Sequence, residues 1–122
     1  PMKSMNLLDE LQFRDQNPYA EPLLVTETGR ILRFTLRPGQ EIREHNAPKS
    51  PFYAVVLKGH GVFAGGDGEA RRFGPNTLLV FDPGENHMIR AEDEELVFVG
   101  FLHGVEDTRP GKVGGKLAQQ GS

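Results

Sequence analysis

The sequence predicts an all-β fold, a small barrel or sandwich of short strands joined by tight turns. Of its 122 residues, 15 are glycine and 9 are proline, and these residues cost about 1 and 3 kcal/mol each inside a helix. Only 37% of the residues are hydrophobic, but the β-branched and aromatic residues come in short runs. The runs recur roughly every 8–12 residues with turn residues between them, which is typical of a barrel or a sandwich. The length suits one domain with one modest core.

The first 21 residues are expected to form a short helix followed by an irregular arm. Asn6 can cap a helix over residues 6–11, with Asp9 in its first turn. Pro18 and Pro22 then interrupt regular structure. The barrel is expected over residues 22–103, and residues 104–122 are expected to form a glycine-rich tail.

From Leu23 onward the hydrophobic pattern has a period of two, the period of a strand. Residues 31–37 alternate apolar and polar side chains, and residues 52–57 are apolar on both faces, as in a buried strand. The segment Gly65-Gly66-Asp67-Gly68 is a strong hairpin signal. The strands expected in chain order are 23–27, 31–37, 41–45, 52–57, 62–64, 70–73, 77–81, 87–91 and 96–103.

Composition excludes several classes of function. The chain has 14 Lys and Arg against 17 Asp and Glu, a net charge of −3, which gives no attraction to nucleic acid or to anionic membranes. It has no cysteine, so disulfide and thiolate chemistry are excluded. The longest apolar stretch, residues 96–102, is far shorter than the roughly 20 residues of a membrane helix. No apolar signal segment follows the N-terminus, so a cytoplasmic protein is expected.

Two segments carry a more specific pattern. The first, residues 38–59, begins with Pro38-Gly39 and contains His45, and the second, residues 74–87, ends with Pro83-Gly84 and His87. In order and spacing they resemble the two motifs of the cupin superfamily. The resemblance covers about residues 31–102 and is to small single-domain microbial cupins. It implies a jelly-roll barrel, also called a double-stranded β-helix, that is commonly a homodimer.

The resemblance also shows where this chain departs from the usual cupin metal site. That site takes two His and one Glu from the first motif and one His from the second. His45 and His87 match the first and last of these ligands. Ala47 stands where the second His belongs, and the Glu position falls on Pro51 or Phe52. The metal motif is therefore degenerate, with two of its four ligands present.

A stable metal site usually needs three or more protein ligands. His103, at the end of the last expected strand, is the candidate third ligand beside His45 and His87. Without a metal, the same histidines would line a ligand pocket together with Arg43 and Tyr53. Arg43 shares the His45 face of its strand, where a cation opposes metal binding and favours a carboxylate or phosphate.

Two functions therefore stay open. The first is a binding protein that holds a small organic molecule in the barrel mouth, with no metal or a weakly bound divalent ion. The second is a metal-dependent enzyme of the dioxygenase or isomerase type that uses His45, His87 and a ligand from outside the motifs. Metal-free acid–base catalysis by either histidine is a third option, but it needs a carboxylate partner that the sequence does not show. The expected partners are a small molecule and a second copy of the chain.

Overall fold

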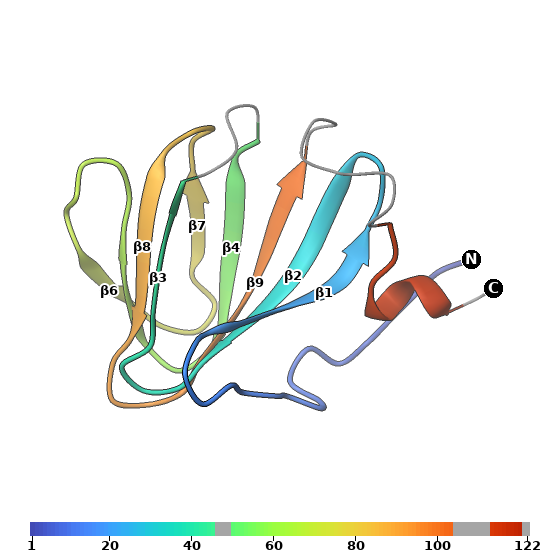
Figure 1. Ribbon diagram of the computed structural model, residues 1–122, viewed down its shortest axis with the longest axis horizontal. Helices are drawn as coiled ribbons and strands as arrows, with labels where there is room; N and C mark the ends of the chain where they lie inside the picture. Colours follow the sequence, from blue (N-terminus) through green and yellow to red (C-terminus); the bar gives the residue numbers. More distant parts are fainter. Residues whose placement is uncertain (46–49, 104–112, 121–122) are drawn as a thin grey trace.

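The computed structural model describes residues 1–45, 50–103 and 113–120, and describes His45 by its backbone alone. Nine strands lie in this part of the chain (Figure 1). They are β1 (Tyr19–Val25), β2 (Gly29–Leu36), β3 (Glu41–His45), β4 (Phe52–Lys58), β5 (Gly61–Ala64), β6 (Arg71–Phe73), β7 (Leu78–Phe81), β8 (Asn86–Ala91) and β9 (Leu96–His103). The all-β prediction is confirmed.

The strands form two antiparallel sheets that face each other. The five-stranded sheet has the order β1-β2-β9-β4-β7, and the four-stranded sheet has the order β3-β8-β5-β6. In Figure 1 the first sheet spans from β1 at the right to its other edge, β7, while β3, β8 and β6 lie at the left. Strands next to each other in a sheet are mostly far apart in sequence, as expected for a jelly roll.

Aromatic rings fill the space between the sheets. Phe34 on β2 stacks on Phe98 of β9 with ring centroids 4.6 Å apart, and Phe63 of the opposite sheet meets Phe98 edge-on at 5.9 Å. Phe52 meets Phe34 edge-on at 5.8 Å. Gly100 leaves room for this contact, because a Cβ there would lie 2.5 Å from the Phe52 ring. These rings belong to one buried cluster that joins the two sheets.

The expected N-terminal helix over residues 6–11 is not formed, and that prediction is wrong. Asn6 caps a single turn and not a helix. Its side chain accepts a hydrogen bond from the Leu8 amide at 3.2 Å, and its carbonyl accepts one from the Asp9 amide at 3.1 Å. Glu10 then adopts a positive φ of 55°, which a right-handed helix does not allow.

Arg33 supplies the physical reason. This side chain on β2 is fully buried on the outer face of the five-stranded sheet, beneath the N-terminal arm. Its Nη1 atom donates to the carbonyl oxygens of Leu7 and Asp9, both at 2.9 Å, and its Nη2 atom donates to Glu21 at 2.6 Å. The guanidinium therefore binds backbone carbonyls in the segment that was expected to form intrahelical hydrogen bonds. The arm is ordered by the sheet and not by its own helical propensity.

The described end of the chain packs against the same side of the molecule. Gly114 pairs with Val25 at the end of β1, and a short 3-10 helix, η3 (Lys116–Gln119), follows. Lys116 donates to Glu10 at 2.9 Å. Part of the expected tail, residues 104–112, lies outside the described residues. No helix in the described part is long and apolar enough to cross a membrane.

Candidate functional site

The register of β3 against β8 decides which side chains meet at the expected site. Glu44 lies directly opposite His87, while His45 lies opposite Asn86. Residues directly opposite each other in an antiparallel pair point to the same face. The nearest described side chain from β3 to His87 is therefore that of Glu44. The side chain of His45 lies outside the described part of the structure.

His87 is held between aromatic rings inside the barrel. Its side chain is only 5% exposed, and its imidazole is parallel to the Phe52 ring, with centroids 5.4 Å apart. Phe81 packs against the same imidazole at 5.1 Å with a tilt of 41°. On its Nε2 side the ring faces Glu44, whose Oε2 atom lies 4.0 Å away. The imidazole thus has apolar walls and a carboxylate at one end.

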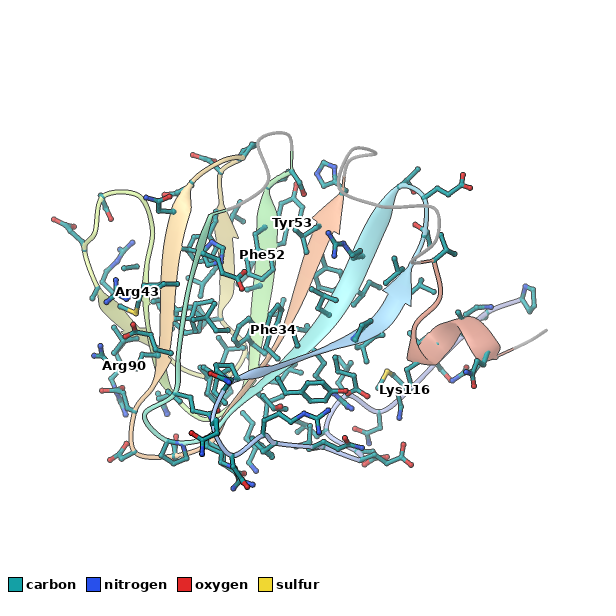
Figure 2. The ribbon with its side chains drawn as sticks, viewed as in Figure 1. Phe34, Arg43, Phe52, Tyr53, Arg90 and Lys116 are labelled. Carbon is teal, nitrogen blue, oxygen red and sulfur yellow. The ribbon has the colours of Figure 1, made fainter. Side chains whose placement is uncertain are left out.

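A second feature, which we call the hairpin cavity, lies beside the turn between β5 and β6. Its volume is about 470 Å³. It is lined by Arg43, Glu44, Ala64, Gly65, Gly66, Gly68, Asn86, His87 and Met88. Figure 2 shows Arg43 beyond β8 and beside the hairpin, on the side away from Phe34 and Phe52. The strand register agrees, because it pairs Arg43 with Met88, one position away from the inward-facing Glu44 and His87.

Arg43 is largely exposed and is oriented by one carboxylate. Its Nε atom donates to Glu41 Oε2 at 2.5 Å. The other oxygen of the same carboxylate lies 3.7 Å from Nη1 of Arg90. Glu41 therefore binds the Nε edge of the Arg43 guanidinium. The two terminal NH₂ groups of Arg43 form a separate pair of donors.

The hairpin wall of this cavity is tied in place by Glu85. One carboxylate oxygen accepts a hydrogen bond from the Gly66 amide at 2.6 Å, and the other accepts one from the Asp82 amide at 2.7 Å. A Cβ at Gly65 would come within 2.6 Å of the same carboxylate. Glu85 thus connects the hairpin to the turn before β8, and the glycine allows the close approach.

Tyr53 and His103 lie elsewhere. Tyr53 follows the inward-facing Phe52, so it points to the outer face of the five-stranded sheet. There its hydroxyl lies 2.9 Å from His103 Nε2, and the two rings stack at 5.6 Å. They line a separate space of about 290 Å³, which we call the outer cavity. It is lined by Leu24, Thr26, Gly29, Arg30, Ile31, Tyr53, Phe101, Leu102 and His103.

Of the residues predicted for the pocket, the structure therefore brings Arg43 and His87 to one cavity and Tyr53 to another. His103, the candidate third metal ligand, accompanies Tyr53 on the opposite side of the five-stranded sheet from His87. Glu44, whose side chain is 62% exposed, is a further residue of the site that the sequence analysis did not single out. Its position opposite His87 depends on the β3–β8 register, which nothing in the sequence specifies.

The described side chains do not fit the usual cupin metal site. Among them, no group of three His, Cys, Asp or Glu residues is placed to hold a metal ion. Beside the His87 imidazole stands the Phe52 ring, at one of the two positions to which the motif's Glu aligned.

Comparison with known proteins decides the family. Residues 32–101, more than half of the chain, match the family model described as the cupin domain. The chain belongs to the cupin family. An RmlC-like cupin from Desulfovibrio desulfuricans is 30% identical, with a TM-score of 0.71 over 83% of this chain and 96% of that one. The resemblance in the motifs and the predicted jelly-roll barrel are both confirmed.

Other solved structures share the fold at lower identity. A conserved protein with a double-stranded β-helix domain from Klebsiella pneumoniae has a TM-score of 0.77 at 20% identity, over 93% of this chain and 95% of that one. A cupin superfamily protein from Desulfitobacterium hafniense has a TM-score of 0.69 at 16% identity, over 84% and 93% of the two chains. No curated protein matches the sequence.

Proposed function

We propose that this cupin binds a small organic anion in the hairpin cavity, and that binding needs no metal. The observation that carries the proposal is the cavity itself, about 470 Å³ in volume, with Arg43 on one wall and the glycines of the hairpin on another. Its volume lies within the range of about 300–1,000 Å³ that is usual for small-molecule sites. Glu85 holds the hairpin wall in place before a ligand arrives.

The chemistry of the wall favours a carboxylate or phosphate group. The guanidinium of Arg43 can bind such a group through two parallel hydrogen bonds, a geometry that a lysine does not provide. Glu41 orients the guanidinium through Nε. Glu44 also lines the cavity and supplies negative charge there. A small ligand that carries an anionic group for Arg43 and hydroxyl groups for Glu44 fits this lining.

A matched pair of arginine variants tests the proposal. Binding of malonate, citrate and glycerol 3-phosphate to the protein, treated with chelator and then freed of it, would be measured by titration calorimetry. We expect Arg43→Gln to weaken binding about tenfold, equivalent to about 1.4 kcal/mol. Arg72→Gln is the control, because Arg72 also donates Nε to a glutamate, at 2.6 Å, but does not line the cavity.

Three outcomes would refute this reading. One is that none of the three anions binds. Another is that Arg43→Gln and Arg72→Gln weaken binding equally, which would indicate an effect of net charge alone. The third is that binding requires added manganese, zinc or nickel, which would favour a metal-dependent cupin enzyme instead.

The Glu44–His87 pair supports a second candidate, metal-free acid–base catalysis. A carboxylate beside a histidine stabilises the imidazolium that forms when the ring accepts a proton. The two side chains are 4.0 Å apart. The test is incubation of the protein in D₂O with malonate or citrate, whichever it binds, followed by proton NMR of the CH₂ group next to the carboxylate. Exchange that is lost in His87→Asn would support catalysis, and its absence with every bound anion would exclude it for them.

We also propose that two copies of this chain associate through β7. This strand is at the edge of the five-stranded sheet, and its outward side chains Leu78 and Val80 are 64% and 55% exposed. Exposed apolar edge strands are ready to pair with another chain. Light scattering should give a dimer mass that Val80→Lys reduces to that of a monomer. A monomeric unmodified protein at the concentrations of the binding assays would refute the proposal.

A further inference from the structure

Two arginines share one carboxylate on the outer face of the four-stranded sheet. Register places Arg90 of β8 directly opposite Glu41 of β3, and Arg43 follows Glu41 by two residues on the same strand. Residues directly opposite each other, and residues two apart on one strand, point to the same face. Figure 2 shows both arginines on the side of β8 away from Phe34 and Phe52. We call Arg43, Glu41 and Arg90 the arginine cluster.

The Glu41 carboxylate turns one oxygen toward each guanidinium. Its Oε2 atom accepts from Arg43 Nε at 2.5 Å, and its Oε1 atom lies 3.7 Å from Arg90 Nη1. The second distance is longer than a hydrogen bond, so the carboxylate attracts Arg90 without using its N–H groups. The side chains of Arg43 and Arg90 are 71% and 44% exposed. Both guanidiniums can therefore meet a ligand that arrives from solution.

The charges near the hairpin cavity show why an anion needs Arg90. Arg43 lines this cavity together with Glu44, and Glu41 is bound to the Nε atom of the same arginine. Without Arg90, one guanidinium would face two carboxylates, and their net negative charge would oppose an anionic ligand. Arg90 balances these charges and places a second cation on the same face as Arg43.

The two guanidiniums also favour a tetrahedral anion over a planar one. A carboxylate group has two oxygens in one plane, and the fork of a single arginine can bind both. A phosphate monoester has three terminal oxygens and a charge of about −1.5 to −2 at pH 7. It can therefore accept hydrogen bonds from Arg43 and from Arg90 at the same time.

Building on the proposed function, we propose that the anionic group bound at the hairpin cavity is a phosphate monoester, and that Arg90 selects it over a carboxylate. The terminal NH₂ groups of Arg43 bind two phosphate oxygens, and Arg90 donates to the third. Arg90 is not one of the residues that line the cavity, so it contacts the phosphate from outside. Glu44 accepts hydrogen bonds from hydroxyl groups on the rest of the ligand.

Glycerol 3-phosphate and glycerate are a matched pair of probes, because both are short hydroxylated chains that differ in the anionic group. Titration calorimetry at constant ionic strength should show glycerol 3-phosphate to bind at least about fivefold more tightly than glycerate at about pH 7.5. In Arg90→Gln this ratio should fall below about twofold. Arg72→Gln is the control, since Arg72 points to the same outer face and its loss removes the same charge, but the ratio should not change.

The pH dependence of binding gives a second readout. The second pKa of a phosphate monoester is about 6, so lowering the pH from about 7.5 to about 5 converts most of the dianion to the monoanion. Over this range glycerol 3-phosphate should lose about threefold more affinity than glycerate, and Arg90→Gln should remove the difference. Titration of Glu44 or His87 acts on the binding of both ligands and cancels in the comparison.

Several results would overturn the role of Arg90. These are equal affinities for the two ligands, an unchanged ratio in Arg90→Gln, or an equal change of the ratio in Arg90→Gln and Arg72→Gln. In each case the proposed function stands as long as Arg43→Gln weakens the binding of both ligands. If neither ligand binds, or if Arg43→Gln has no effect, the proposed function fails and the role of Arg90 fails with it.

Discussion

Removal of the Arg33 side chain should detach the N-terminal arm and destabilise the whole barrel. The guanidinium is fully buried and makes five hydrogen bonds: two to Glu21, two to the carbonyls of Leu7 and Asp9, and a longer one of 3.5 Å to the Glu10 carbonyl. In Arg33→Met the four acceptor atoms, Glu21 Oε1 and the three carbonyl oxygens, lose this donor at once. The Glu21 carboxylate, only 15% exposed, would be left without this partner.

The magnitude follows from what is left behind. Breaking one side of a buried ion pair typically costs about 3–5 kcal/mol, because the remaining charge stays buried. In a domain of this size, each kcal/mol lowers the melting temperature by about 4 °C. Arg33→Met should therefore lower it by about 12–20 °C. Arg37→Met is the control, since Arg37 is half exposed and its pair with Asp15 spans 3.4 Å, so a change below about 1 kcal/mol is expected.

A second variant separates the ion pair from the carbonyl contacts. Replacement of both partners, Arg33→Met with Glu21→Met, removes the buried charge but still leaves the Leu7 and Asp9 carbonyls without their donor. Calorimetric melting should show the double variant to be more stable than Arg33→Met alone, yet less stable than the unmodified protein. A melting temperature within about 3 °C of the unmodified protein for Arg33→Met would refute the reasoning, because the arm would then contribute little to stability.

Three further predictions follow from other contacts. Gly59→Ala should lower the free energy of unfolding, measured by chemical denaturation, by at least about 2 kcal/mol more than Gly39→Ala does. Both glycines have a positive φ, but only a Cβ at Gly59 would overlap a carbonyl, that of Glu95. Equal losses of stability in the two variants would contradict this. The hydrogen bond from Lys116 lowers the pKa of Glu10 and the bond to Glu10 raises the pKa of Lys116. The pair should therefore stabilise the C-terminal segment fully at any pH between the ordinary pKa values of a glutamate and a lysine. The stabilisation should be lost as the pH falls through the lowered pKa of Glu10 or rises through the raised pKa of Lys116. An NMR titration should show the chemical shift of the Gly114 amide changing over the same pH ranges, and Glu10→Gln should remove this change. Titration of the protein with zinc should leave its melting temperature unchanged. If the melting temperature rises and the rise saturates at one zinc ion per chain, the described side chains do take part in a metal site, contrary to our reading.

The barrel could be predicted because its signals are local. Alternation in residues 31–37, the glycine hairpin at 65–68 and the Pro-Gly turns each depend on a few adjacent residues. The bounds of β3 and β9 agree with those expected from the sequence. The N-terminal helix failed because its fate depends on Arg33, more than twenty residues away along the chain.

The residues of the candidate site were harder to predict, because they depend on which faces of the strands point into the barrel and which strands pair. Alternation along residues 96–103 puts His103 on the same face as Val97, Val99 and Phe101, but it does not reveal that this face is the outer one. Likewise, nothing local to Glu44 indicates that it lies opposite His87. Register and sheet packing are long-range properties, and a single sequence carries little direct information about them.

The contact between the two described ends of the chain has a practical consequence. Ser4 and Gln120 are joined by two hydrogen bonds, of 3.0 and 2.7 Å, which run in opposite directions between them. Figure 1 shows both ends at the side of the molecule away from β6. A surface tether at either end would therefore leave the hairpin cavity facing solution, so binding could be measured on immobilised protein. A short peptide linker between the ends could close the backbone into a ring, leaving new ends to be opened at an exposed turn.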